Sequence, residues 1–277
     1  MKKLSRSPVV TGLMFMLAVV LLFAGTVGGT QAALQVYSSD YLSAFDLDHI
    51  GVTLLENNNI VAYRNYGTTA AAGFTEEQDG DLVMNSLGND SELKIGKDYD
   101  FEIKARNTGT IDQYVRVTIY KAWYDASGTN GPKGWFHGNN TPKIRDTQYD
   151  LSNIVLSYKV NNSYLDYNTT NWVKDTDPRS DTAERDIYYY KGTLVPGQET
   201  EPLLTTLKIS PNVALTPIAK TVGNTTYYTY AYDGLGFVVK AEVDAVQTHH
   251  AGKAIRSAWG MANNSIMAQM GISDPNE

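Results

Sequence analysis

Residues 98–124, DYDFEIKARNTGTIDQYVRVTIYKAWY, alternate between apolar and polar side chains. In the first half the apolar positions share one face and the charged positions share the other. The apolar positions are Tyr99, Phe101, Ile103 and Ala105. Because successive side chains of a strand point to opposite faces of a sheet, this period of two predicts a half-buried β-strand.

The alternation pauses at residues 107–110, Asn-Thr-Gly-Thr, where Asn and Gly tolerate the positive φ of a tight turn. It then resumes with apolar positions expected to point inward at Val115, Val117 and Ile119. The intervening positions are expected to point outward: Tyr114, Arg116, Thr118 and Tyr120. We therefore expect residues 98–124 to form a hairpin at the centre of an antiparallel sheet with one solvent-exposed face.

Further strand-like segments follow one another along the chain, at residues 45–55, 151–160, 185–195, 203–209, 225–232 and 236–246. The last two are expected to form a hairpin across Asp233-Gly234, a common two-residue turn. The 19 Tyr and 23 Gly, with only 19% charged residues, also favour an all-β protein. We predict an all-β jelly-roll or Greek-key β-sandwich over residues 45–250. Residues 57–93 are polar with little periodicity, and we expect a loop insertion there, with one short strand near residues 81–84.

The C-terminal residues 251–277 have a different pattern. AGKAIRSAW at residues 251–259 favours a short helix, in which Ile255 and Trp259 share a face. Residues 263–277 are polar with scattered Met, and we expect a frayed tail there.

The N-terminal residues 1–32 have the pattern of a secretory signal peptide. Three positive charges in the first six residues precede an apolar run at residues 9–25, and small residues follow it. The predicted cleavage is after Ala32, and the alternative is after Ala33. An uncleaved membrane anchor is the other interpretation, but the run is short for a bilayer span and no positive charges follow it. We predict a secreted mature protein with no membrane attachment after cleavage.

Composition restricts the possible functions. The chain has no cysteine, which excludes disulfides, thiolate metal sites and a cysteine nucleophile. The formal charge is −7, and removing residues 1–32 leaves 20 basic and 30 acidic residues, a charge of −10. Such an acidic protein is not expected to bind nucleic acid.

Four segments resemble the TasA/camelysin family of secreted Gram-positive proteins: residues 28–41 (GGTQAALQVYSSDY), 48–58 (DHIGVTLLENN), 107–117 (NTGTIDQYVRV) and 245–260 (AVQTHHAGKAIRSAWG). Residues 57–93 lie largely outside this resemblance. The resemblance implies a jelly-roll subunit that a dedicated signal peptidase processes during export. It also implies a head-to-tail homopolymer in the fibres of the biofilm matrix, where other matrix proteins are possible partners.

The assembly mechanism that the resemblance implies is donor-strand complementation, in which the new N-terminus pairs with the next subunit's sheet. The extended segment is residues 33–44, with Leu34 and Val36 as the inserted side chains. The residues assigned to the donor strand are Ala33, Leu34, Val36, Tyr37 and Tyr41. A free strand-like segment can pair with an exposed sheet edge, and a contact that does not close generates a filament. The sequence leaves open the alternative that this segment pairs within its own sandwich.

Camelysin itself is classed as a metallopeptidase, so we looked for metal ligands. The four histidines are His49, His137, His249 and His250, and no H-E-x-x-H pattern is present. Adjacent histidines point in different directions on a strand or a helix. Asp175, Asp177 and Asp181 have calcium-ligand chemistry, but the glycine and distal glutamate of an EF-hand loop are missing. We interpret that loop, and the acidic run at residues 76–81, as solvated, and we predict no catalytic, metal-binding or cofactor-binding residues.

Aromatic clusters suggest an alternative function as a monomeric cell-surface adhesin or carbohydrate-binding module, because aromatic rings stack on sugars. The clusters are Trp123/Tyr124, Trp135/Phe136, Trp172 and Tyr188–Tyr190. Tyr and Trp on strands are also ordinary sheet residues. The sequence therefore predicts a secreted structural subunit first, an adhesin second and a metallopeptidase third.

Overall fold

The computed structural model of the chain describes residues 9, 12–20, 48–66, 76–78, 80–82, 93–125, 149–177, 179, 182–215 and 217–273. The chain divides into two units, Met1–Leu47 and Asp48–Glu277. In the first unit, residues 12–20 are helical. None of the described helices combines the length and the apolar character that a membrane crossing requires.

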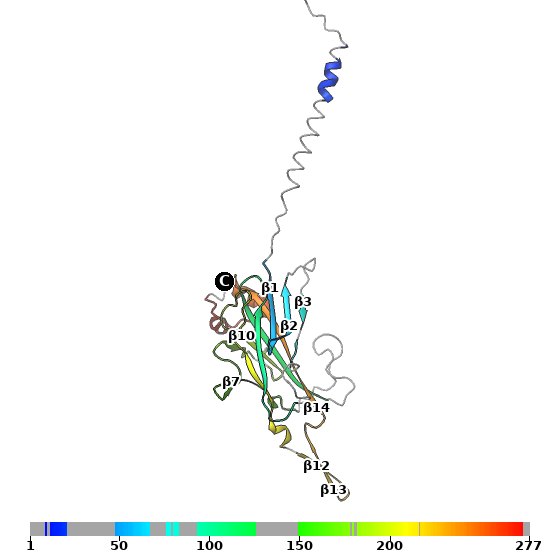
Figure 1. Ribbon diagram of the computed structural model, residues 1–277, viewed down its shortest axis with the longest axis vertical. Coiled ribbons are helices and arrows are strands. Elements are labelled where there is room, and N and C mark those ends of the chain that lie inside the picture. Colours follow the sequence, from blue (N-terminus) through cyan, green and yellow to red (C-terminus); the bar gives the residue numbers. More distant parts are fainter. Residues whose placement is uncertain are drawn as a thin grey trace, which may run out of the picture. The chain divides into compact units, whose positions relative to one another are not determined.

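The second unit is an antiparallel β-sandwich with short C-terminal helices, which confirms the predicted all-β sandwich class (Figure 1). The seven-stranded sheet has the order β3 (Glu76–Gln78), β2 (Asn59–Tyr66), β1 (Ile50–Glu56), β5 (Tyr99–Asn107), β11 (Leu204–Ile209), β7 (Ile154–Val160), β8 (Ser163–Leu165). The five-stranded sheet has the order β4 (Gly80–Asp81), β14 (Leu235–Gln247), β6 (Gln113–Asp125), β10 (Arg185–Tyr190), β9 (Trp172–Lys174). Single-turn helices occupy Leu151–Asn153 and Pro211–Ala214. A separate two-stranded sheet contains β12 (Pro217–Val222) and β13 (Thr225–Tyr230).

The core lies between the two large sheets. The apolar positions predicted for β5 are confirmed as buried: Tyr99, Phe101, Ile103 and Ala105 are 0–4% exposed. They meet Val115, Val117 and Ile119 from β6, which are buried as expected. Two β6 residues expected on a solvent-exposed face, Tyr114 and Thr118, are buried instead.

The expected hairpin at residues 98–124 is wrong, because β5 and β6 belong to different sheets. β5 pairs with β1 and β11, whereas β6 pairs with β10 and β14. The connection between them crosses from one sheet to the other. Asn107 stabilises it by donating from Nδ2 to the carbonyl oxygens of Ile111 (2.8 Å) and Leu194 (2.7 Å). Gly109 packs so closely that a Cβ there would lie 2.5 Å from the His49 carbonyl oxygen.

The expected hairpin across Asp233-Gly234 is also wrong. Gly234 does make a turn with φ +78°, but the strand before it, β13, pairs with β12. The strand after it, β14, pairs along its whole length with β6. The hairpin turn lies instead between Val222 and Thr225, where Gly223 has φ +61°.

The loop expected at residues 57–93 is interrupted by β2, an eight-residue strand paired with β1. Asn57 and Asn58 form the intervening turn with φ 49° and 67°, a left-handed conformation that Asn tolerates. The short β3 and β4 follow. Because β3 pairs with β2 and β4 pairs with β14, this part of the chain connects the edges of the two sheets.

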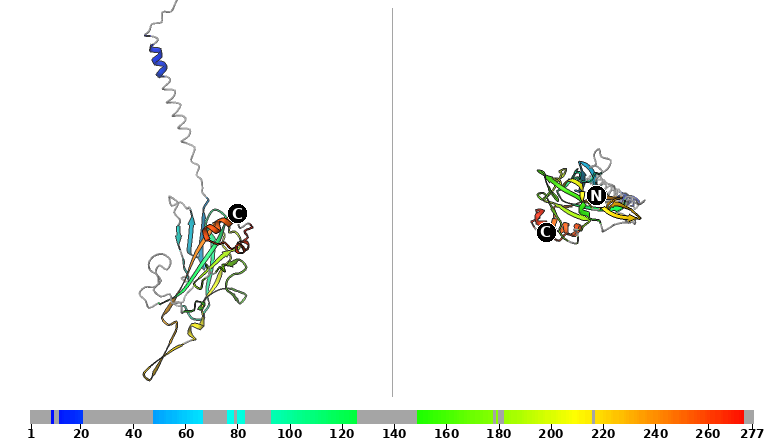
Figure 2. Two further views of the ribbon diagram at one scale, coloured as in Figure 1. Left: turned by 180° about the vertical axis from the view of Figure 1, so that it is seen from behind. Right: turned by 90° about the horizontal axis from the view of Figure 1, so that it is seen from below.

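The C-terminal residues cover the outer face of the five-stranded sheet. α2 (Ala251–Trp259) has the predicted bounds. The frayed tail expected from residue 263 is wrong for the described residues, since α3 (Asn264–Gln269) follows, with the Asn263 side chain accepting from the backbone N–H groups of Ser265 and Ile266. The buried side chains of α2, α3 and the residues around them form a second apolar cluster with the sheet. This cluster includes Tyr114, Tyr189, Val246, Ile255, Ile266, Met267 and Met270. Figure 2 shows these helices from two further directions.

Candidate functional site

The residues predicted for assembly and processing lie outside the described part of the chain. They are Ala32, Ala33, Leu34, Val36, Tyr37 and Tyr41. Their roles therefore stay predictions. His137 and the Trp135/Phe136 cluster also lie outside the described residues.

The aromatic clusters that suggested sugar binding are mostly buried. Trp172 lies in the edge strand β9 and is 0% exposed. Its indole Nε1 donates to the Glu201 carbonyl oxygen at 3.0 Å, and its ring packs edge-on against Tyr190 at 5.2 Å between centroids. Trp123, Tyr188 and Tyr189 are buried as well. These rings are packed inside the protein, where they contribute to its two apolar clusters.

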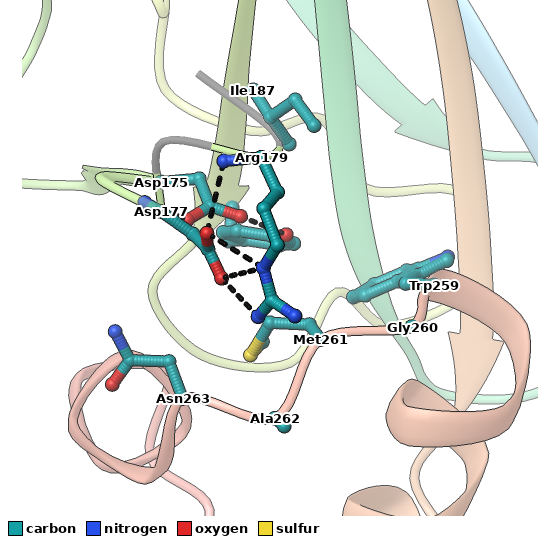
Figure 3. Close-up of a pocket in the computed structure, with 10 residues that line it drawn as sticks. Asp175, Asp177, Arg179, Ile187, Trp259, Gly260, Met261, Ala262 and Asn263 are labelled. Atoms are coloured by element: carbon teal, nitrogen blue, oxygen red, sulfur yellow. Dashed lines mark hydrogen bonds and ion pairs between the residues drawn. The ribbon is translucent and has the colours of Figure 1, made fainter.

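A cavity of ≈ 230 Å³ lies beside the five-stranded sheet, where residues from β10 and the segment after β9 face the connection between α2 and α3 (Figure 3). Its apolar wall contains Ile187, Trp259 and Met261. Trp259 is tilted 36° against Tyr189 with 5.6 Å between ring centroids. The Arg116 guanidinium lies 5.3 Å from the Trp259 ring, within the range of a cation–π interaction.

The polar wall of this cavity is formed by residues of the predicted acidic loop. Asp175 is 3% exposed, so the expectation that this loop is solvated is wrong at this residue. Its carboxylate accepts from the Tyr189 hydroxyl at 3.0 Å and from the Asp177 backbone N–H at 2.9 Å. Burial raises the pKa of Tyr189, and the negative charge of Asp175 raises it further.

Asp177 and Arg179 form an exposed ion pair at the mouth of the cavity. The Arg179 Nη2 donates to an Asp177 carboxylate oxygen at 2.6 Å, and these hydrogen bonds lower the pKa of Asp177 to about 2. In Figure 3 the Arg179 side chain runs beside Asp177 toward Met261, and Trp259 stands on the other side of the cavity. Carboxylates beside aromatic rings suit a small cationic group, but the Arg179 guanidinium already supplies that charge.

A second polar cluster links the two sheets through ion pairs. Asp244 of β14 lies between the guanidinium groups of Arg64 from β2 and Arg116 from β6. The Asp244 side chain is 3% exposed, and one of its oxygens accepts from Arg116 Nε at 3.0 Å. Burial raises the pKa of the adjacent Tyr66, and the negative charge of Asp244 raises it further. No sequence pattern indicated this cluster, because its members are far apart along the chain.

Histidines do not gather into a metal centre among the described residues. The His249 and His250 rings lie edge to face with 4.0 Å between centroids, and His250 has a left-handed φ of 50° just before α2. His49 lies before β1, where its backbone N–H donates to Thr110 Oγ1 at 2.9 Å. Within the described ranges, no three His, Cys, Asp or Glu side chains are placed to hold one metal ion.

The exposed aromatic residues of the described chain lie elsewhere than the predicted clusters. Tyr227, Tyr228 and Tyr230 of β13 are all more than half exposed, and Tyr164 of β8 is 46% exposed. The outermost strands of the two large sheets, β3, β8, β4 and β9, are only two or three residues long. Short edges of this kind are one way in which sheets limit pairing with other chains.

Comparisons with protein-family models, with curated proteins and with solved structures found no match to this chain.

Proposed function

We propose that the mature chain is a secreted structural subunit that polymerises head to tail through its N-terminal segment, residues 33–44. Signal-peptide cleavage would release this segment, and its Leu34 and Val36 side chains would then insert into the sheet of another copy. The resemblance to the TasA/camelysin family motivates the proposal, and the architecture supports it.

The observation that carries the proposal is the position of the first described strand in the sandwich. The unit that contains the sandwich begins at Asp48, and its first described strand, β1, starts at Ile50. β1 is an interior strand with β2 on one side and β5 on the other. Neither edge of β1 is therefore open to residues 33–44 of the same chain. A strand-like segment released by cleavage can pair with a sheet edge of another copy.

Strand addition would provide both affinity and direction. Main-chain hydrogen bonds join the added strand to an edge, and alternate side chains enter pockets that select the register. A subunit that donates at one surface and accepts at another makes a heterologous contact, which generates an open filament. Before cleavage, the apolar residues 9–25 would keep the segment tethered and prevent early assembly.

The test compares the mature chain starting at Ala33 with a chain that retains residues ahead of it, by negative-stain electron microscopy. We expect fibres from the first and monomers from the second. Deleting residues 33–41 should leave a folded monomer, because the described sheets and the core between them are formed by residues from Ile50 onward. Fibres that still form after this deletion would show that the donor assignment is wrong.

A matched pair of substitutions tests whether only one face of the donor segment inserts into the next subunit. Val36→Asp places a charge on the inserted face and should abolish fibres, since a buried unpaired carboxylate is costly. Gln35→Asp places the same charge on the opposite face and should permit them. Equal behaviour of the two variants would contradict insertion of one face.

A further inference from the structure

The β12–β13 hairpin projects away from the sandwich as a separate two-stranded sheet (Figures 1 and 2). All six residues of β13 are exposed, including Tyr228 at 69%. Within the described residues neither outer edge of this hairpin has a strand neighbour. Two strands alone are at best marginally stable in water, and a third strand would satisfy one row of their free backbone groups.

The two outer edges of the hairpin differ in how they discourage pairing. β12 begins with Pro217, which cannot donate a backbone hydrogen bond, and carries the charged Lys220. Proline and lysine are common protective residues on edge strands. β13 reads TTYYTY and has no charge, proline or glycine. The edge of β13 is therefore the unprotected one.

The hairpin and the start of the domain lie at opposite ends. β14 begins at Leu235, directly after the hairpin, and ends at Gln247. Gln247 pairs with Gln113, whose side chain donates to the Gly51 carbonyl oxygen at the start of β1. The length of β14, about 40 Å at the rise of a β-strand, thus separates the hairpin from the residues that follow the N-terminal segment. Figure 1 shows β1 and the hairpin at these two ends.

We infer that the outer edge of β13 is the acceptor for residues 33–41 of another copy, an inference that rests on the proposed function. The donor leaves one end of the domain and the acceptor projects from the other, which is the arrangement that a head-to-tail filament needs. Residues 33–47 span about 50 Å when extended, enough to leave the domain and lie along a six-residue strand.

Charge and side-chain chemistry fit this occupant. The mature chain is acidic, so copies repel one another over most of their surface. The donor residues 33–41 contain one acid, Asp40, and β13 contains no acid that would repel it. Leu34 and Val36 would lie beside the tyrosines of β13, and pairs of aromatic and aliphatic side chains stabilise neighbouring strands.

Disulfide trapping tests the acceptor directly, because the chain has no cysteine of its own. Mature chains carrying Val36→Cys are mixed with chains carrying Thr225→Cys, Thr226→Cys or Thr229→Cys on β13, and oxidised gently. The matched control is Thr221→Cys on β12, which lies opposite Thr226. A strand added to β13 lies about 4.8 Å from it and about 10 Å from β12, and a disulfide needs Cα atoms within about 7 Å.

We expect a mixed disulfide with at least one β13 cysteine, at about tenfold or more over the Thr221→Cys control, since only β13 comes within bonding distance. Disulfides only between two copies of a β13 variant would overturn the inference and indicate that the hairpins pair with each other. Fibres that form without a mixed disulfide would overturn the assignment of β13 as the acceptor but would not contradict the proposed function. Neither fibres nor a mixed disulfide would overturn both.

Discussion

β5 and β13 are both antiparallel strands made of residues that favour β-structure, but their surroundings are opposite. β5 lies in the interior of the seven-stranded sheet, and its apolar side chains are buried against the other sheet. In the part of the chain that the structure describes, β13 has β12 as its strand neighbour, and every residue of β13 is exposed. The two strands therefore have similar strand propensity but contribute differently to the stability of the domain. Burial rather than strand propensity supplies most of the stability of a sheet.

The difference indicates which strand is available for another chain. Removing a side chain from β5 costs packing that the whole sandwich shares. Removing one from β13 costs the isolated domain little, so a tyrosine-rich sequence there is better explained by a contact that forms outside it. Four substitutions test this contrast between buried and exposed positions.

The largest effect is expected at Phe101, which is 0% exposed on β5. Phe101→Ala should lower the free energy of unfolding by about 4 kcal/mol, because it leaves a cavity between the two sheets. Urea denaturation of the mature chain measures this change. A loss below about 1 kcal/mol would contradict the position of Phe101 in the core.

A smaller but still large effect is expected at Asp244, a buried polar residue. Asp244→Ala should cost about 3 kcal/mol, because Arg64 and Arg116 would lose the carboxylate that both of them bind. The matched control is Glu199, which also binds two cations, Arg106 and Lys104, but whose side chain is 29% exposed.

Glu199→Ala should cost less than about 1 kcal/mol, because solvent screens an ion pair at the surface. Urea denaturation of both variants gives the comparison. Equal costs for the two variants would show that burial of Asp244 does not determine its contribution.

The sequence was sufficient for two features whose signal is local. The alternation of β5 predicted which side chains are buried, and the helical pattern of residues 251–259 predicted α2 with its observed bounds. Each of these features depends on neighbours within a few positions, so periodicity reveals it.

Strand pairing was not predictable in the same way. The residues at 107–110 and at 233–234 do change the direction of the chain, but turn chemistry does not determine which strand the chain meets next. The connection after β5 crosses to the other sheet, and there Asn107 donates a hydrogen bond to the carbonyl oxygen of Leu194, 87 residues away. β2 was missed because its sequence, NIVAYRNY, does not alternate between apolar and polar residues, and its burial does not alternate either.

The candidate site shows the same limit. Asp175 was noticed as a carboxylate, but its burial depends on Tyr189 and on the α2–α3 connection, which lies more than 80 residues further along the chain. The sequence did not indicate that the tyrosines of β13 are exposed. Tyr188 and Tyr189 also lie in a run of tyrosines, and both are buried. The donor residues remain a prediction from the sequence and its resemblance.

The smallest effect on stability is expected at Tyr228 of β13. Tyr228→Ala should change the free energy of unfolding by less than about 0.5 kcal/mol, because an exposed side chain on a projecting hairpin has little packing to lose. If β13 accepts the donor segment, the same substitution should nevertheless weaken assembly and raise the protein concentration at which fibres appear. Urea denaturation and a sedimentation assay on one preparation separate the two effects. A variant that loses stability but assembles normally would contradict this prediction. Tyr228 would then stabilise the domain, and β13 would have no role in contacts between copies.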